Sequence, residues 1–191
     1  MAQTRSARPT ALALWLIVAG VIGWWAAFSL TMERFAQLAD PDAIASCDFS
    51  LLVQCTANLE SAQGSVFGFP NPILGLTGWV APIVVGFALL AGARFARWFW
   101  WCFWAGTAFA FGFVLWLISQ SLFALGTLCP WCMVTWAVTI PTFYAVTVHA
   151  LRESGVGWAR RLAPWVPLMA IVTFAVVAAV AQLQLNWLAQ L

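Results

Sequence analysis

The length of its uncharged stretches constrains this chain more than any other feature. Four stretches contain no Asp, Glu, Lys or Arg: Pro9–Met32, Ser61–Ala93, Trp98–Leu151 and Leu162–Leu191. A helix needs roughly 20 apolar residues to cross the ~30 Å hydrocarbon core of a membrane. Only 7% of the 191 residues are charged, whereas soluble proteins have about a quarter. The sequence therefore predicts an all-α integral membrane protein.

The third stretch is long enough for two crossings, with the polar residues 119–121 and Gly126 as the break between them. The other stretches hold one crossing each. The sequence thus predicts one membrane domain over residues 1–191, with transmembrane helices at about 11–32, 72–93, 98–119, 130–151 and 164–187 and a loop at 34–71. We expect the first helix to be retained, because its uncharged run exceeds the 7–15 residues of a signal-peptide core.

The arginines predict the orientation of these helices. Seven of the eight fall on one side in this topology: Arg5, Arg8, Arg94, Arg97, Arg152, Arg160 and Arg161. The positive-inside rule makes that side cytoplasmic. The N-terminus is then inside, and the 34–71 loop and the C-terminus are outside. His149, at the cytoplasmic end of the helix at 130–151, is interpreted as a surface residue.

Two cysteines lie at the predicted outer end of the helix at 130–151, in "TLCPWCMV". Proline is favoured at a first helical position, so Pro130 places Cys129 at the N-cap and Cys132 one turn later, as Pro72 and Pro164 mark two other helix starts. The unpaired N–H groups and the positive dipole end of a helix favour a thiolate over a thiol. The placement of this pair therefore predicts reactive cysteines.

The outer loop contributes two more thiols, Cys47 and Cys55. All four cysteines would face the compartment where disulfides form and persist in bacteria. Cys102 begins the helix at 98–119 near the opposite membrane surface, beyond the ~7 Å limit for a bridge. It is interpreted as a small apolar packing residue.

Four thiols on one face are compatible with several kinds of chemistry. A structural zinc site usually has two close pairs, whereas Cys47 and Cys55 are eight apart. Haem attachment needs a histidine after the second cysteine, and Met133 stands there. Inert structural disulfides are the third possibility, although a bridge across three residues constrains the unfolded chain very little. A thiol–disulfide relay is therefore the leading hypothesis, and no metal is expected.

A relay needs an electron acceptor. The sequence has no nucleotide-binding glycine loop and no haem-ligand pair, whereas a membrane contains quinones, which carry two electrons. A flat quinone headgroup suits an aromatic-lined helix bundle with a few hydrogen-bond donors near the thiols. The 14 tryptophans and 15 phenylalanines support this only weakly, because many must face lipid.

Together these residues resemble the vitamin K epoxide reductase family in its bacterial form. The resemblance rests on a cysteine pair in the first outer loop ("SCD", with Cys55 eight residues after Cys47), on "FGFPNPILG", and on "CPWCMVTWA". It implies a four-helix bundle around a quinone pocket, a fifth transmembrane helix, and an extracytoplasmic loop or half-helix that covers the pocket. It covers the chain from the first helix through the fourth, with a fifth as in bacterial members.

The resemblance implies roles for particular residues. Cys47 and Cys55 would take electrons from an extracytoplasmic thioredoxin-fold protein, and Cys55 would attack a Cys129–Cys132 disulfide at Cys129. Cys132 would then face the quinone. Asn71 would donate a hydrogen bond to a quinone carbonyl, although it could also cap the helix at 72–93. Three further residues are assigned to the quinone site: Ser61 in the half-helix, Phe67 and Trp136.

The chain departs from the family pattern at two points. Trp136 stands where the family often has tyrosine, and an indole N–H donates a hydrogen bond but accepts none. Some bacterial members continue into a thioredoxin domain, whereas this chain ends at Leu191. The donor is therefore expected to be a separate protein, and a strongly oxidising DsbA-like protein is the expected candidate.

The acidic residues of the loop have two interpretations. Asp40, Asp42, Asp48 and Glu60 could simply solvate an outer face, or Asp48 could make the neighbouring Cys47 thiol a weaker acid. The sequence as a whole predicts a thiol:quinone oxidoreductase of the bacterial cytoplasmic (inner) membrane, with menaquinone or ubiquinone as acceptor and no nucleic-acid partner. A non-catalytic scaffold with structural disulfides and a relay running from quinol to thiols are the alternatives.

Overall fold

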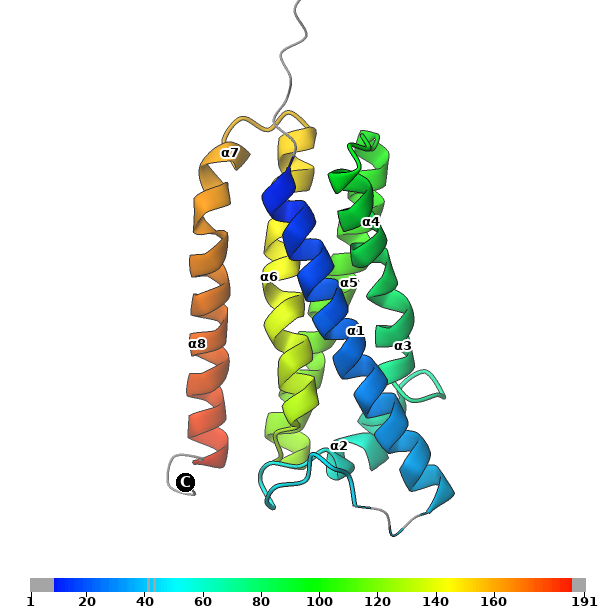
Figure 1. Cartoon of the computed structure of the whole chain (residues 1–191). Coiled ribbons are helices and arrows are strands. Elements are labelled where there is room, and N and C mark those ends of the chain that lie inside the picture. The colour runs from blue at the N-terminus through cyan, green and yellow to red at the C-terminus, as the bar shows by residue number, and fades with distance from the viewer. Residues whose placement is uncertain (1–8, 41, 43, 187–191) are drawn as a thin grey trace, which may run out of the picture.

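The computed structural model describes residues 9–40, 42 and 44–186, and within them the chain is helical (Figure 1). Five helical segments are long and apolar enough to cross a membrane: Thr10–Ala39, Pro72–Leu90, Arg97–Leu125, Pro130–Glu153 and Ala159–Leu185. The predicted all-α multi-pass membrane fold is confirmed. Arg5, Arg8 and residues 187–191 lie outside the described residues.

The first and fourth segments are single helices, α1 (Thr10–Ala39) and α6 (Pro130–Glu153). Helix α1 runs seven residues past its predicted end at residue 32, because its last two turns pack against the loop that follows. Gln37 is buried there and donates a hydrogen bond to the Thr56 hydroxyl (3.0 Å). The charged residues Glu33 and Arg34 therefore lie within the helix rather than after it.

The second segment is broken where the sequence predicted one helix. It consists of α3 (Pro72–Gly78) and α4 (Val80–Leu90), with Trp79 at the junction. Pro82 has no N–H and cannot donate to the carbonyl four residues earlier, so the helical ladder is interrupted at Gly78. The break turns the indole of Trp79 toward the inside of the bundle, where it packs near Ala19 and Val138.

The third segment also differs from the prediction. Helix α5 (Arg97–Gln120) does not stop at the polar residues 119–121 but continues as a π-helical turn, η2 (Ser121–Leu125). Gly126, with φ of +67°, ends it, as the sequence indicated. The fifth segment begins before Pro164, in α7 (Ala159–Leu162) and η3 (Ala163–Trp165), and continues as α8 (Val166–Leu185).

Helices α1, α3–α4, α5 and α6 form a four-helix bundle, and α8 packs on the outer side of α6 (Figure 1). Helix α4 packs on α1, and α5 packs on α6. Tyr144 of α6 and Thr173 of α8 are joined by a hydrogen bond of 2.8 Å. We call the end that carries α2 (Thr56–Glu60) and Cys129 the cysteine end, and the opposite end, with Arg94, the arginine end.

The arginine end of the bundle is closed by apolar packing. The buried side chains come from all four segments and are Ala13, Leu16, Val85, Leu89, Trp100, Val146 and Ala150. His149 joins them, with its ring edge-on to Trp100 at 4.1 Å between centroids. The interpretation of His149 as a surface residue is therefore wrong: its side chain is buried because α5 lies directly over it.

Close contact between α1 and the second segment depends on small residues. A Cβ atom on Gly23 would overlap the indole of Trp79, and a Cβ on Gly86 would lie 2.8 Å from the carbonyl oxygen of Ala13. We expect Gly23→Leu to lower the stability of the protein by about 1–3 kcal/mol, the usual cost of overpacking. Thermal unfolding in detergent measures this change.

The matched control is Gly112→Leu in α5, because a Cβ on Gly112 has no atom within 4 Å. Its melting temperature should stay at or above that of the wild type. Equal melting temperatures for the two variants would show that the contact of α1 with Trp79 does not limit the packing of the bundle.

Candidate active site

Cys129 and Cys132 lie at the start of α6, as the proline position predicted. Cys129 is the N-cap residue in an extended conformation, and Pro130 follows in the first turn. The Cys132 N–H donates to the Cys129 sulfur over 3.2 Å. One of the otherwise unpaired N–H groups of the helix start is therefore bonded to the sulfur of the N-cap residue.

A short parallel bridge fixes the loop against this helix start. The Leu128 N–H donates to the carbonyl of Leu52 (2.7 Å), and the Gln54 N–H donates to the carbonyl of Leu128 (3.0 Å). Because Cys55 directly follows Gln54 and Cys129 directly follows Leu128, the bridge brings the two cysteines together. Their sulfur atoms lie 3.6 Å apart, and both side chains are fully buried.

The four cysteines at this end are present as one disulfide and two free thiols. Cys47 and Cys55 form a disulfide, and Cys129 and Cys132 are free thiols. Thiol–disulfide exchange requires a thiolate in contact with a disulfide sulfur, and Cys129 has that position relative to Cys55. The ligand atoms of Cys47, Asp48 and Cys55 also lie within 4.8 Å of one another, but a disulfide sulfur carries no charge with which to bind a cation.

Asp48, which precedes α2 by eight residues, caps the start of that helix with its carboxylate. Its carboxylate accepts hydrogen bonds from the N–H groups of Cys55 (2.6 Å) and Thr56 (3.2 Å) and from the Thr56 hydroxyl (2.6 Å). Burial by itself would raise the pKa of Asp48, but these three hydrogen bonds outweigh it and lower the pKa below its ordinary value. For Asp48 the interpretation as a merely solvating charge is wrong, since the carboxylate holds Cys47 and Cys55 together independently of their disulfide.

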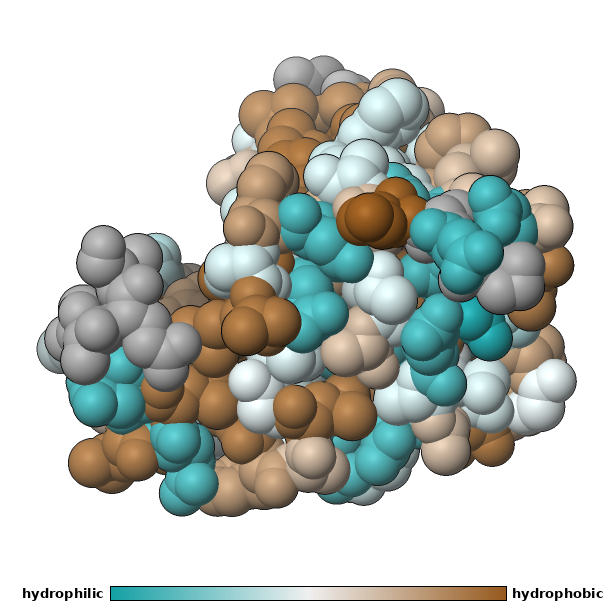
Figure 2. Space-filling model, turned by 90° about the horizontal axis from the view of Figure 1, so that it is seen from below, coloured by the Kyte–Doolittle hydropathy of each residue, from teal (hydrophilic) through white to brown (hydrophobic). Residues whose placement is uncertain are grey.

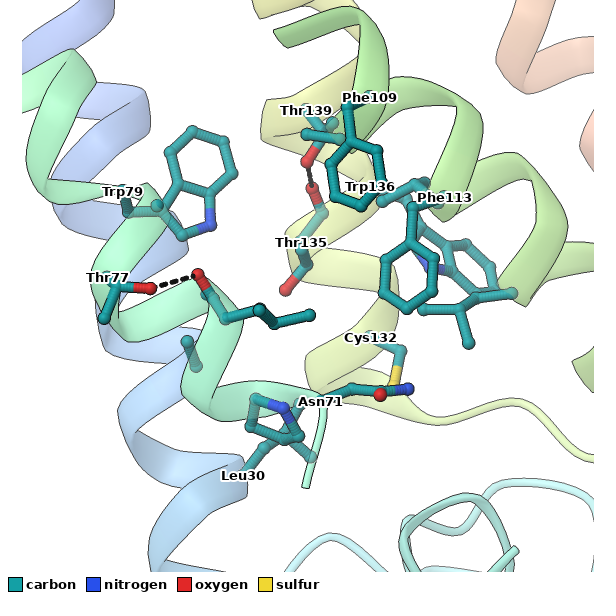
Figure 3. A pocket seen from close by; sticks show the side chains of 18 of the residues that line it. Leu30, Asn71, Thr77, Trp79, Phe109, Phe113, Cys132, Thr135, Trp136 and Thr139 are labelled. Atoms are coloured by element: carbon teal, nitrogen blue, oxygen red, sulfur yellow. Dashed lines mark hydrogen bonds between the residues drawn. The ribbon is translucent and has the colours of Figure 1, made fainter. Parts of the chain in front are cut away.

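A cavity of about 580 Å³ lies between the second segment and α5 and reaches the cysteine end. Figure 3 shows Trp79 on one wall, Phe109 and Phe113 of α5 on the other, and Thr135 and Thr139 of α6 between them. Cys132 and Asn71 lie at the same end of this cavity. Its walls are mostly apolar, and polar groups are concentrated near Cys132, the usual pattern of a small-molecule site.

Asn71 and Ser61 both line the cavity and also hold the loop above it. The amide of Asn71 donates to the carbonyl of Gln63 (2.6 Å) and accepts from the N–H of Val66 (3.2 Å). It occupies the N-cap position of α3 but makes no side-chain cap bond there. The Ser61 hydroxyl donates to the carbonyl of Asn58 (2.8 Å) and accepts from the N–H of Gly64 (3.0 Å).

These bonds form a folded cover at the cysteine end, composed of α2, η1 (Ala62–Ser65) and the turn up to Asn71. Asn58 fastens it to the bundle, because its amide donates to the Thr127 hydroxyl (3.0 Å) and accepts from the Ser121 hydroxyl (2.8 Å). Gln63 adds a bond to Gln120 of α5 (3.3 Å). The cover corresponds to the predicted half-helix over the pocket.

The other residues predicted for the site have different positions. Trp136 is buried and lines the cavity. Phe67 does not line it: the side chain is half-exposed and meets the cavity wall only through Phe113, at 5.8 Å between ring centroids. Cys102 is exposed and lines the cavity toward the arginine end, so its interpretation as a packing residue is wrong.

Sequence reasoning missed several wall residues, of which the threonines are the most informative. Thr135, Thr139 and Thr142 all line the cavity. Thr135 lies three residues after Cys132, Thr139 four residues after Thr135, and Thr142 three residues after Thr139. This spacing places the cysteine and the three threonines on one face of α6. That spacing could have identified them. Trp79 carried no comparable signal, because its direction depends on the break at Gly78.

The fold and the site define a multi-pass membrane protein with a thiol–disulfide system at the mouth of an apolar cavity. Residues 14–147 match the family model described as "Vitamin K epoxide reductase family". The chain belongs to this family of membrane oxidoreductases that act on thiols and quinones. No curated protein matches the chain in a sequence comparison. The resemblance seen in the cysteine and "PNPILG" motifs is thus confirmed at the level of the family.

Asp48 provides a test of the cap. We expect Asp48→Ala to reduce the protection of the Cys55 and Thr56 amides from hydrogen exchange and to make the Cys47–Cys55 disulfide easier to reduce. In the wild type, the stabilisation is present above the ordinary carboxyl pKa of about 3.9. It is lost as the pH falls through the lower pKa of folded Asp48, because protonation removes the acceptor charge.

Asp42→Ala is the matched control, since the Asp42 carboxylate is exposed and accepts none of these bonds. Unchanged amide protection in Asp48→Ala, measured by hydrogen exchange at neutral pH, would contradict the capping role.

Proposed function

We propose that the protein is a thiol:quinone oxidoreductase that reoxidises an extracytoplasmic thioredoxin-fold, DsbA-like protein through a relay of Cys47, Cys55, Cys129 and Cys132. The observation that carries the proposal is the 3.6 Å contact between the sulfurs of Cys55 and Cys129, next to a cavity that Cys132 lines. Membership of the family supports a thiol and a quinone as the reactants.

The relay consists of two exchanges and one oxidation. Donor thiols reduce the Cys47–Cys55 disulfide, and the donor leaves as a disulfide. The Cys55 thiolate then attacks Cys129 of a Cys129–Cys132 disulfide, and Cys132 leaves as a thiolate. Cys47 displaces Cys129 from Cys55, which restores the disulfide seen in the structure and leaves Cys129 and Cys132 as thiols. This last arrangement is the one the structure contains.

The cavity fits a quinone in size and in chemistry. Its volume of about 580 Å³ lies within the range of about 300–1,000 Å³ for small-molecule sites. Aromatic rings lie on both walls, and hydrogen-bonding groups lie near Cys132. A bound menaquinone or ubiquinone accepts the two electrons and two protons that Cys129 and Cys132 give up when they form a disulfide.

The residues around Cys132 orient the acceptor. Asn71 uses one amide hydrogen on Gln63 and has a second that can donate to a quinone carbonyl. Trp136 and Ser61 line the same cavity, and Phe67 supports its wall through Phe113. Because Asn71 is held by two loop contacts, its direction toward the cavity is fixed before the quinone binds.

The proposed orientation follows the arginines. The cysteine end faces the extracytoplasmic side of a bacterial inner membrane, and the arginine end faces the cytoplasm. In the described residues, the turns that carry Arg94, Arg97, Arg152, Arg160 and Arg161 lie at the end opposite to Cys55 and Cys129 (Figure 1). An inert scaffold accounts less well for the arrangement, since Cys129 and Cys132 are free thiols.

The sulfur contact can be trapped. In the double variant Cys47→Ser/Cys132→Ser, we expect Cys55 and Cys129 to form a disulfide under mild oxidation, because their sulfurs already lie 3.6 Å apart. Peptide mapping by mass spectrometry identifies the bond. The control Cys55→Ser/Cys129→Ser retains Cys47 and Cys132 and should form no comparable bond. Failure of Cys55 and Cys129 to join would overturn the relay.

The cavity can be filled without disturbing its surroundings. Gly106 lines it, and a Cβ there has no atom within 4 Å. We expect Gly106→Phe to raise the quinone KM on the order of tenfold, which corresponds to about 1.4 kcal/mol of lost binding, while the melting temperature is retained. Quinone reduction by purified protein with a reduced DsbA-like donor measures this effect.

Gly112→Phe is the matched control in the same helix, outside the cavity lining, and should keep the wild-type KM. Cys132→Ala should abolish quinone reduction altogether. An unchanged KM in Gly106→Phe would place the quinone elsewhere, and wild-type rates in Cys132→Ala would refute the mechanism.

A further inference from the structure

Large exposed apolar side chains flank Cys47 in the sequence of the loop at the cysteine end. Ile44 is 82% exposed, Phe49 74% and Leu51 92%. We propose that the segment 44–51 is the docking surface for the thioredoxin-fold electron donor, and that it binds an apolar active-site face bordered by basic residues. This inference rests on the proposed function and adds the surface that selects the partner.

The segment is folded into two consecutive turns. The Asp48 N–H donates to the carbonyl of Ala45 (3.0 Å), and the Phe49 N–H donates to the carbonyl of Val53 (2.9 Å). These turns present the three apolar side chains outward while Cys47 is only 3% exposed. The loop lies beyond the helix ends (Figure 1), and Figure 2 shows apolar residues scattered among hydrophilic ones on this face.

The structure distinguishes the two sulfurs of the loop disulfide. Cys55 is held by the bridge at Gln54 and by Asp48, and its sulfur is directed at Cys129. Cys47 is carried by the segment with the exposed side chains. The donor therefore attacks Cys47, and Cys55 is released where it contacts the next thiol of the relay.

Attack on Cys47 requires the segment to move, because its sulfur is covered. Burial of Phe49 and Leu51 against a partner removes apolar surface from water and so provides free energy for that movement. The free energy needed to uncover the Cys47 sulfur is then supplied by binding of the partner. Small thiols, which make no such contact, gain nothing from it.

The charges near the segment favour a basic partner. The residues 33–60 contain five acidic side chains, Glu33, Asp40, Asp42, Asp48 and Glu60, and one arginine, Arg34. Asp40, Asp42 and Glu60 are exposed. Opposite charge on the donor would accelerate encounter at low ionic strength, and salt would screen this effect.

The exchange at this surface transfers two electrons from the donor to the Cys47–Cys55 pair. A donor thiolate attacks the Cys47 sulfur, a donor–Cys47 disulfide forms, and the Cys47–Cys55 bond breaks with Cys55 as the leaving thiolate. The second donor thiol then attacks its partner sulfur and releases Cys47. The donor is oxidised by two electrons, and the loop pair is reduced by two.

The test compares two electron donors with the same purified protein. Quinone reduction is measured in Phe49→Asp and Leu51→Asp with a reduced DsbA-like protein, and separately with dithiothreitol. We expect kcat/KM for the protein donor to fall on the order of tenfold, as for a central interface residue. The rate with dithiothreitol should be unchanged, and Leu51→Met should behave as the wild type with both donors.

Ala62→Asp is the matched control for added charge, because Ala62 is exposed at the same end and lies outside the segment and the cavity lining. A wild-type rate with the protein donor in Leu51→Asp, or an equal loss with both donors, would overturn the docking surface. Failure of the wild-type protein with both donors would instead refute the proposed function.

Discussion

The two backbone hydrogen bonds between Leu128 and residues 52–54 of the loop are the constraint on which the rest of the site depends. They join residues 52–54 of the loop to the residue before Cys129. Without them, Cys55 would be connected to the bundle only through α2 and its neighbours. With them, a loop thiol and a helix thiol meet at 3.6 Å, and a reaction that needs two sulfurs in contact has its geometry before any partner binds.

Burial gives the three inner sulfurs distinct surroundings. Cys55 and Cys129 are fully buried in a small apolar cluster with Leu30 and Leu59, whereas Cys132 borders the cavity. Water is therefore kept from the contact between the Cys55 and Cys129 sulfurs. Leu30 and Leu59 also line the cavity, so the cluster and the cavity are neighbours; in the proposed reaction the quinone would approach Cys132 from the cavity, and the protein donor would approach Cys47 from the loop side.

Most of the fold, and part of the site, could be predicted from the sequence because the signals are local. The uncharged stretches predicted five spans, and Pro130 predicted the N-cap at Cys129, since run length and proline position act within a few residues. The break at Trp79 follows from Pro82, a signal that the predicted single helix at 72–93 did not take into account. The cap by Asp48 and the burial of His149 depend on contacts that form only in the folded chain. Those contacts leave no periodic pattern, which is also why Phe67 and Cys102 were misplaced.

The apolar packing around Trp100 and Leu16 at the arginine end has a consequence for bioenergetics. It fills the described part of the bundle at that end with apolar side chains, which are a barrier to ions. In the proposed reaction, thiols release protons and the quinone takes them up at one and the same surface. Electron transfer would then be electrically silent, and disulfide formation would proceed at the same driving force whether the membrane is energised or not.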